Sequence, residues 1–331
     1  MMSHASNDPH LWAIVLAGGE GERMKPLVER WLGGHRPKQY CAFVGSRSMF
    51  QHTVDRALAV TRPEQIIAVV GRDHCEHVTA QLLHRGPARV IYQPANRDTA
   101  AGIFLPLTYV AVQDPEATIV VLPSDHFAYP EERFVQAIRE AVLAARAAPG
   151  RVVLLGVPPD RLELDYGWIE RERSALLLNG IQVNPVRSFL EKPDKAKAQA
   201  AWRAGALWNT LVFAARIETL WNLGRRCLPS LMSLFDRLRE AIGTPEEDQV
   251  LQAIYQIMPA KNISFDLLQC ATEHLTVLEL NEVLWSDWGR PERVGEALRK
   301  IGRVPAFPEE LLASGGHLPA QRESNDQTLT V

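Results

Sequence analysis

Five short apolar runs alternate with helix-spaced segments over the first 160 residues, and this alternation constrains the fold more than any other feature. The runs cover residues 12–17, 65–70, 89–93, 118–122 and 152–156. The segments between them, near residues 48–60, 73–83, 99–112 and 134–145, repeat apolar side chains at helical spacing. Strand–helix alternation of this kind predicts an α/β fold with a mainly parallel sheet and helices on both faces.

The second half of the chain is less regular. Strands are predicted at 166–170, 186–191 and 275–280, and helices at 195–204, 228–242, 246–257, 265–272 and 291–301. After Gly302 the composition turns to Pro, Gly, Ser and Gln, so we expect disorder from about Pro319 onward. A length of 331 residues fits one large α/β domain with additions, or two domains.

Composition argues against several classes of protein. The 36 basic and 39 acidic residues give a net charge of -3, which argues against nucleic-acid binding. No apolar run approaches the ~20 residues that span a bilayer, so we expect no membrane association. The polar first ten residues do not resemble a signal peptide. Four scattered cysteines without a C-x-x-C pair indicate neither a disulfide scaffold nor a thiolate zinc site, so we expect a cytoplasmic protein with reduced thiols.

A glycine-rich segment, Leu16-Ala-Gly-Gly-Glu-Gly-Glu-Arg-Met-Lys-Pro26, follows the first predicted strand. Its three glycines permit close backbone approach to an anion. The segment lacks the Gly-Lys-Ser/Thr of a Walker A loop, and Arg23 stands where the dinucleotide fingerprint requires a third glycine. A fixed cation at this place suits a polyphosphate. The alternative is a glycine turn that carries a surface arginine.

Two further segments carry charges that suit phosphate chemistry. Lys38 lies in the proline-stiffened segment Arg36-Pro-Lys-Gln39 and supplies a second cation. Asp125, in Pro123-Ser-Asp-His126, follows a buried strand, where a carboxylate is well placed to bind Mg²⁺. The alternative for Asp125 is a turn or a helix cap.

The segment Asp73-His-Cys-Glu-His77 holds several potential metal ligands. His74 and His77 are three residues apart and could share one face of a helix. An exposed, polar first helical turn explains the same residues, and we favour that interpretation.

Together these residues resemble the sugar-1-phosphate nucleotidyltransferases, and among them most closely the mannose-1-phosphate guanylyltransferases. The resemblance covers about residues 11–300 and rests on motifs within 16–39, 96–100, 123–126, 166–170, 189–193, 207–209 and 285–287. It implies a Rossmann-like nucleotide-diphospho-sugar transferase fold. A nucleotide-binding half would cover 11–160, a sugar-phosphate-binding half 161–300, and a small C-terminal extension 301–331.

The resemblance also implies a reaction. A sugar 1-phosphate, here mannose 1-phosphate, attacks the α-phosphorus of a nucleoside triphosphate, here GTP. Pyrophosphate leaves, and GDP-mannose forms by direct displacement, with Mg²⁺ as cofactor and without a covalent enzyme intermediate. Such chemistry needs mainly positioning and charge neutralisation, which matches the residue types present.

Site residues follow from the motifs by position. The resemblance implies catalytic roles for Arg23, Lys38 and Asp125, with Asp125 and Asp287 as metal ligands. It implies nucleotide binding by Leu16, Ala17, Gly18, Gly19, Gly21, Asn96, Asp98, Thr99 and Ser124. It implies sugar-phosphate binding by Tyr166, Gly167, Glu191, Lys192 and Asn209.

Several departures from the family pattern keep alternatives open. Glu20 and Glu22 place acidic groups near the phosphates unless their side chains point outward. Asn209 is followed by Thr210-Leu211 rather than Ser-Gly, which changes the predicted sugar pocket. The alternatives are another sugar 1-phosphate or another base, or a catalytically weak homologue that binds a nucleotide-sugar and regulates a partner. We expect no fused isomerase domain, and the sequence leaves a homodimer open.

Overall fold

The computed structural model describes residues 8–82 and 89–312. Nine strands form a path of hydrogen-bonded neighbours, and the short strand β8 (Leu176–Leu178) pairs with β9. In spatial order the path runs β3 (Arg89–Gln93), β2 (Ile66–Gly71), β1 (Leu11–Ala17), β4 (Thr118–Pro123), β10 (Leu207–Arg216), β6 (Val152–Val157), β11 (Leu275–Glu279), β9 (Ile181–Glu191) and β7 (Gly167–Arg171). On this path β10 and β9 run opposite to the other strands. The predicted α/β class, with a mainly parallel mixed sheet, is confirmed.

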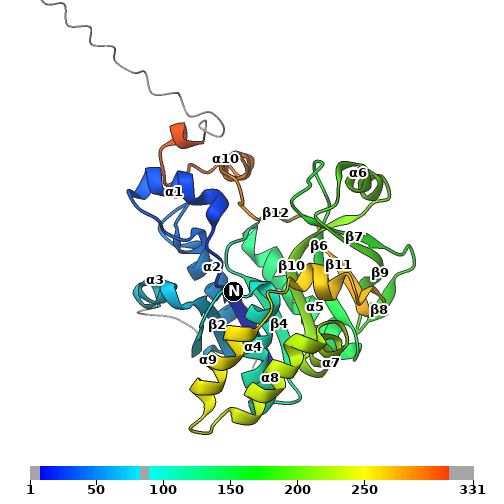
Figure 1. Cartoon of the computed structure of the whole chain (residues 1–331). Helices are drawn as coiled ribbons and strands as arrows, with labels where there is room; N and C mark the ends of the chain where they lie inside the picture. The colour runs from blue at the N-terminus through cyan, green and yellow to red at the C-terminus, as the bar shows by residue number, and fades with distance from the viewer. Residues whose placement is uncertain (1–7, 83–88, 313–331) are drawn as a thin grey trace, which may run out of the picture.

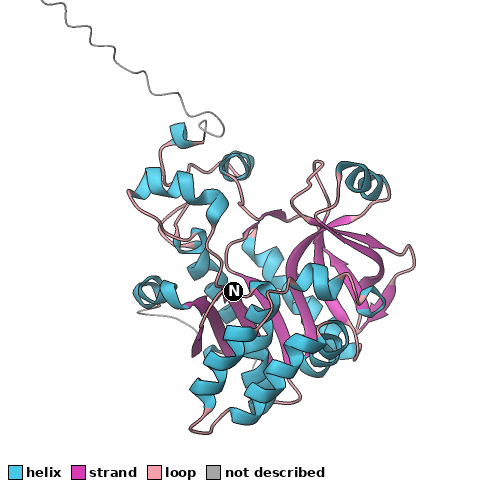
Figure 2. Cartoon of the chain, viewed as in Figure 1, coloured by secondary structure: helices cyan, strands magenta, loops and turns pink. Residues whose placement is uncertain are grey.

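Helices cover both faces of the sheet, as Figure 2 shows. Side chains alternate along β1, so Trp12 and Ile14 join one hydrophobic core while Ala13 and Val15 join the other. The first core includes residues of α4 (Asp98–Gln113), α7 (Ile217–Cys227), α8 (Pro229–Ala241) and α9 (Glu247–Ile257). The second includes residues of α2 (Met49–Val60), α3 (Cys75–Gln81), α5 (Glu131–Ala147) and α6 (Lys195–Arg203). Burial on both faces explains why the central strands are apolar throughout.

A third, smaller core lies at one end of the molecule. It joins α1 (Lys25–Leu32), α10 (Pro291–Lys300) and Phe307, and Figure 1 shows both helices grouped apart from the main sheet. A two-stranded sheet of β5 (Phe127–Tyr129) and β12 (Leu284–Ser286) pairs Ser286 with Phe127. This register brings the chain that follows β12 beside the chain that follows β4.

The remaining elements are short. They are the single-turn helices η1 (Glu22–Met24), η2 (Lys38–Tyr40), η3 (Pro63–Gln65), η4 (Arg72–His74), η6 (Thr272–His274) and η7 (Glu309–Leu311), and the π-helix η5 (Ile263–Leu268). Within the described ranges, no helix is both long and apolar enough to cross a membrane.

Some sequence predictions differ from the structure. The helix predicted at 265–272 is the short π-helix at 263–268, which Asn262 caps. The sequence patterns do not predict β10, because Asn209 and Thr210 interrupt its apolar run at a bulge. They also do not predict α1 and α7. The disorder predicted from Pro319 lies outside the described residues.

Candidate active site

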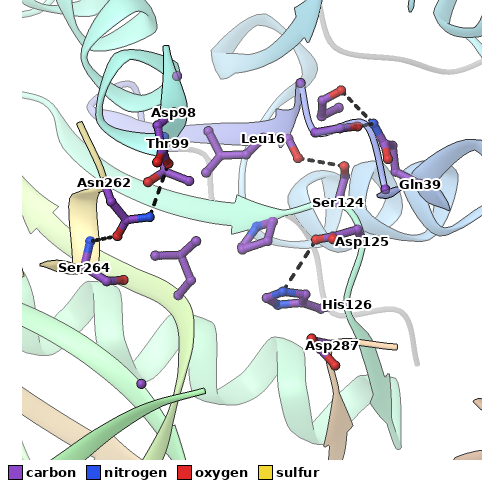
Figure 3. A pocket seen from close by; sticks show the side chains of 18 of the residues that line it. Leu16, Gln39, Asp98, Thr99, Ser124, Asp125, His126, Asn262, Ser264 and Asp287 are labelled. Carbon is purple, nitrogen blue, oxygen red and sulfur yellow. Dashed lines mark hydrogen bonds and ion pairs between the residues drawn. The ribbon is translucent and has the colours of Figure 1, made fainter. Parts of the chain in front are cut away.

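A cavity of about 750 Å³ opens beyond the carboxyl ends of β1 and β4, which lie side by side. This is where open α/β sheets bind their ligands. All the predicted site residues line the cavity except Lys38, which instead contacts two of them, Asp125 and Asp287. Figure 3 shows Asp98, Thr99 and Asn262 on one side of this pocket and Asp125 and Asp287 on the other.

The glycine-rich loop is held in place by a side chain that approaches it from η2. Gln39 Nε2 donates hydrogen bonds to the carbonyl oxygens of Ala17, at 3.0 Å, and Gly19, at 2.7 Å. Gly21 has a φ of 68°, in the left-handed region that favours glycine. Because Gln39 donates to them, the carbonyl oxygens of Ala17 and Gly19 are hydrogen-bonded within the protein itself.

His74 also supports this loop, and its exposure was predicted wrongly. We expected an exposed helical turn, but His74 is buried in η4, directly after β2, with 2% of its surface exposed. Its Nδ1 atom lies 3.2 Å from the Ala17 carbonyl oxygen, and its Nε2 atom lies 3.3 Å from Glu20 Oε1. Glu20 therefore points toward His74, and Glu20 is not among the residues that line the cavity. This orientation removes the conflict between Glu20 and a bound phosphate.

Lys38 links the two predicted metal carboxylates. Its Nζ atom lies 2.9 Å from Asp125 Oδ2 and donates a 2.5 Å hydrogen bond to the Asp287 carbonyl oxygen. Burial opposes ionisation of Asp125, but Lys38 and His126 outweigh it and hold the pKa of the Asp125 carboxyl below its ordinary value. Burial opposes ionisation of Asp287 too, but Lys38 and Arg293 hold the pKa of that carboxyl far below its usual range. Both carboxyl groups are therefore anions near neutral pH.

Donors surround the Asp287 carboxylate. Its Oδ1 atom accepts hydrogen bonds from Tyr166 Oη at 2.8 Å, Arg293 Nη1 at 2.8 Å and the Gly289 amide at 2.9 Å. Its Oδ2 atom lies 3.2 Å from Arg23 Nη2. The two oxygens thus differ, because three donors occupy Oδ1 and one cation lies beside Oδ2.

The donor set at this end fits a magnesium ion that arrives with a phosphate. Asp125 and Asp287 offer carboxylate oxygens, which Mg²⁺ prefers. In the described part of the chain, no group of three or more His, Cys, Asp or Glu side chains could hold a metal by itself. Mg²⁺ is commonly bound by one or two carboxylates together with waters and substrate phosphates, so two carboxylates suffice.

The opposite side of the cavity is built by the start of α4 and the start of η5. Asn262 Nδ2 donates to Asp98 Oδ1 at 3.2 Å, and the Ile263 amide donates to Thr99 Oγ1 at 2.9 Å. Sequence reasoning missed Asn262, although an Asn before a helical segment is a capping signal that could have pointed to it. It also missed the lining residues Gln93, Asp165, Ala260 and Ser264, and it gave no role to Gln39, Leu211 and Trp285, which lie in the motifs or beside them.

The predicted sugar-phosphate residues form a third part of the wall. A Cβ atom on Gly167 would come within 2.8 Å of Glu191 Oε2 and 3.2 Å of Asn209 Cβ, so a larger residue there would displace the Glu191 carboxylate. Burial raises the pKa of Glu191 above its ordinary value. Lys192 is exposed at the rim of the cavity.

Backbone strain gathers around this cavity. Among the described residues, six non-glycine residues have a φ in the left-handed region. Asp98, Lys192 and Leu211 line the cavity, and Trp288 follows Asp287 directly. Because such conformations persist only where the surrounding structure enforces them, they cluster at functional sites.

One protein family model and several curated proteins are similar to this chain over most of its length. The family model described as nucleotidyl transferase matches residues 12–303. The alginate biosynthesis protein AlgA of Pseudomonas aeruginosa is 32% identical over 315 residues, which cover 92% of this chain and 62% of that protein. A mannose-1-phosphate guanylyltransferase of Escherichia coli is 28% identical over 286 residues, covering 84% of this chain and 58% of that protein. The chain thus spans less than two thirds of the length of these curated relatives.

A solved structure shares the fold over most of its length. It is a Thermus thermophilus protein described as a mannose-1-phosphate geranyltransferase, with a TM-score of 0.75 and 27% sequence identity. The match covers 87% of this chain and 79% of that one.

Proposed function

The chain belongs to the nucleotidyl transferase family, and we propose that it transfers a guanylyl group from GTP to mannose 1-phosphate. The products would be GDP-mannose and pyrophosphate. The choice of GTP and mannose 1-phosphate is supported by relatives named for that reaction, including the Escherichia coli protein. The choice of reaction class is supported by the site itself.

The observation that carries the proposal is the arrangement of charges at one end of the cavity. Arg23 and Lys38 lie beside Asp287 and Asp125, respectively, at the end of the cavity that the glycine-rich loop lines. Displacement at a phosphorus atom needs cations for the transferred and leaving phosphates, and carboxylates for a metal ion. Arg23, Asp125 and Asp287 line this end of the cavity, and Lys38 contacts both Asp125 and Asp287.

Each residue has a defined task in this proposal. The amides of residues 18–21 bind the phosphates of the nucleotide, and Arg23 and Lys38 neutralise charge on the phosphoryl groups as pyrophosphate leaves. Asp98 and Thr99, opposite the carboxylates, help bind the base. Lys192 binds the phosphate of the sugar 1-phosphate, and Glu191 with Asn209 binds sugar hydroxyl groups.

A magnesium ion held by Asp125 and Asp287 would neutralise and orient the triphosphate when bound. The protein residues do the remaining work by positioning. They hold the phosphate oxygen of the sugar 1-phosphate in line with the α-phosphorus and exclude water from it. No enzyme nucleophile is required, so one displacement completes the reaction.

A second candidate function is a nucleotide-sugar-binding regulator with little turnover. Glu20 and Glu22 are two of the sequence features in its favour, because acidic side chains in the loop would repel phosphate. Glu20 points to His74, Glu22 is exposed, and neither lines the cavity, so this argument for the regulator is weakened. The altered segments that follow Asn209 and Asp287 are the remaining departures, and they leave Arg23, Lys38, Asp125 and Asp287 in place.

The test is release of pyrophosphate by the purified protein with Mg²⁺. Four nucleoside triphosphates are crossed with a panel of hexose 1-phosphates. We expect the highest kcat/KM with GTP and mannose 1-phosphate, and a maximum elsewhere would reassign the base or sugar. If no pair reacts while GDP-mannose still raises the Tm of the protein, the regulator is correct and the enzyme is not.

A further inference from the structure

Leu211 has a backbone conformation that leucine rarely adopts. Its φ is 58°, in the left-handed region where a Cβ atom crowds the neighbouring carbonyl oxygen. The residue lies in β10, inside a shift of register against β6 that runs from Asn209 to Phe213. Bulges of this kind re-aim side chains and are common beside active sites.

Hydrogen bonds on both sides enforce this conformation. The Leu211 amide donates to Asn209 Oδ1 at 3.1 Å, and the Val212 amide donates to Thr210 Oγ1 at 3.2 Å. The Thr210 hydroxyl in turn donates to the Leu155 carbonyl oxygen at 2.7 Å. The Thr210 hydroxyl therefore ties the bulge to β6. If Leu211 relaxed to an extended conformation, the hydrogen bonds of the bulge would break.

The strained residue lines the cavity. Leu211 is partly buried and stands in the cavity wall together with Asn209, Gly167 and Glu191. These three residues are close neighbours, because a Cβ atom on Gly167 would touch both Asn209 and Glu191. Leu211 thus lies next to Asn209, whose side chain its amide contacts, and lines the same cavity as the residues that we assign to the sugar.

We propose that Leu211 is a specificity-determining residue that limits the size of the sugar 1-phosphate. It would admit hexose 1-phosphates that carry only hydroxyl groups on the ring and exclude 2-acetamido-hexose 1-phosphates. This inference rests on the proposed function, because it assumes that the sugar 1-phosphate binds against the part of the cavity wall that contains Asn209. The hydrogen bonds at the bulge hold Leu211 in a strained backbone conformation, which places a large apolar side chain in the cavity wall.

The test compares three variants of Leu211 that separate side-chain size from backbone conformation. Leu211→Ala and Leu211→Gly remove the bulk, whereas Leu211→Met keeps it. The readout is the kcat/KM ratio of mannose 1-phosphate to N-acetylglucosamine 1-phosphate. We expect the ratio to fall about tenfold or more in the Ala and Gly variants, as for the loss of hydrophobic bulk in a pocket, and to stay near the wild-type value in the Met variant.

A second measurement tests the conformation without any need for activity. Gly tolerates a positive φ and Ala does not, so we expect Leu211→Gly to melt at a higher temperature than Leu211→Ala. Leu143, exposed on α5, supplies the matched control, since in a helix the Ala variant should melt above the Gly variant. If the Ala variant melted at a higher temperature than the Gly variant at position 211 as well as at position 143, Leu211 would not be strained.

Other outcomes separate this inference from the proposed function. If Leu211→Ala changes the preference among nucleoside triphosphates and not among sugars, Leu211 faces the base and the inference is wrong. If the wild type shows no turnover, the ratio is taken from calorimetric binding of the two sugar 1-phosphates. Unchanged binding selectivity in the Ala and Gly variants would then overturn the inference, whatever the fate of the enzymatic proposal.

Discussion

The amino group of Lys38 lies 2.9 Å from Oδ2 of Asp125, although only 4% of the Lys38 side chain is exposed. Arg23 makes the corresponding contact with Oδ2 of Asp287 at 3.2 Å. Each carboxylate that we assign to the metal is thus paired with a cation that we assign to phosphate. Binding of a metal–nucleotide complex must exchange these partners, so that the metal contacts the carboxylates and the cations contact the phosphates.

The first prediction concerns Asp125. Asp125→Asn keeps the size of the side chain but removes its charge, so the metal and Lys38 both lose a partner. We expect kcat to fall roughly 10²–10³-fold, the usual effect of removing one electrostatic contact in an active site. Pyrophosphate release across a Mg²⁺ titration measures it, with Asp194→Asn at the start of α6 as a control. Activity like that of the wild type would remove Asp125 from the metal site.

A second prediction tests the exchange of partners at Asp287. Three donors already occupy Oδ1, so Oδ2 is the oxygen that a metal would use, and Arg23 competes for it. We expect Arg23→Gln to tighten Mn²⁺ binding by the nucleotide-free protein up to about fivefold, as for a half-exposed ion pair worth up to about 1 kcal/mol. Turnover should fall at the same time.

Electron paramagnetic resonance of free Mn²⁺ measures this affinity without turnover. Arg290→Gln is the matched control, because Arg290 contacts Asp165 at 2.6 Å, and its loss removes a nearby positive charge while leaving the Arg23–Asp287 pair in place. Equal effects of the two variants would mean that general electrostatics, not direct competition, controls the metal.

Local sequence patterns were sufficient to predict that the glycine-rich loop and the segment around Asp125 lie at the same edge of the sheet. β1 and β4 are apolar runs, each followed at once by its functional loop, and neighbouring parallel strands bring those loops together. The position of Asp287 was predicted only by resemblance. Its geometry depends on the pairing of β12 with β5 and on contacts with residues as distant as Arg23, which no local pattern encodes.

His74 and Leu211 show a second limit of sequence patterns. A polar helical turn looks exposed in sequence, yet His74 is buried with one ring nitrogen beside the Ala17 carbonyl oxygen and the other beside Glu20. Leu211 follows Asn209 and Thr210 in β10, and no glycine in this strand signals its positive φ. Both features arise from contacts that form only after the sheet has assembled.

His74 is expected to act on nucleotide binding from behind the loop. His74→Ala removes the contacts with Ala17 and Glu20, so the loop loses support, and we expect the KM for GTP to rise several-fold. The KM for mannose 1-phosphate should not change, and His74→Gln should restore part of the affinity through its amide donor. His77→Ala is the control, since His77, in the following helix α3, stacks on Tyr40 with ring centroids 5.3 Å apart. Equal effects on both substrates would indicate a general loss of structure.

Lys192 is expected to act on the other substrate. Its side chain is exposed at the cavity rim, where its ammonium group would meet the phosphate of the sugar 1-phosphate. Lys192→Met keeps the apolar stem and removes the charge, so we expect the KM for mannose 1-phosphate to rise about tenfold with little change for GTP. Lys195→Met, on α6, provides the control. An unchanged KM for the sugar phosphate would exclude this role.

The last prediction concerns stability and pH. Asp165 contacts Arg290 at 2.6 Å, Arg293 at 3.2 Å and Arg23 at 3.5 Å. Burial opposes ionisation of this carboxyl, but Arg290 and Arg293 outweigh it, so the pKa of Asp165 is lower in the folded protein than in the unfolded chain. A carboxyl with a lowered pKa stabilises the fold above its unfolded pKa of about 3.9, and this stabilisation is lost as the pH falls further.

Asp165→Asn should therefore lower the free energy of unfolding by about 1–2 kcal/mol near neutral pH, as for the loss of a charged hydrogen-bond acceptor. The difference between wild type and variant should be constant from about pH 8 to pH 6 and should shrink below about pH 4, because the wild type then loses the same charge. Urea unfolding across this pH range measures it. Asp160→Asn is the control, as Asp160 is more exposed and meets Arg161 and Lys300 at the surface. A difference that persists unchanged at the acidic end would mean that Asp165 stabilises the fold through its shape and hydrogen bonds rather than its charge.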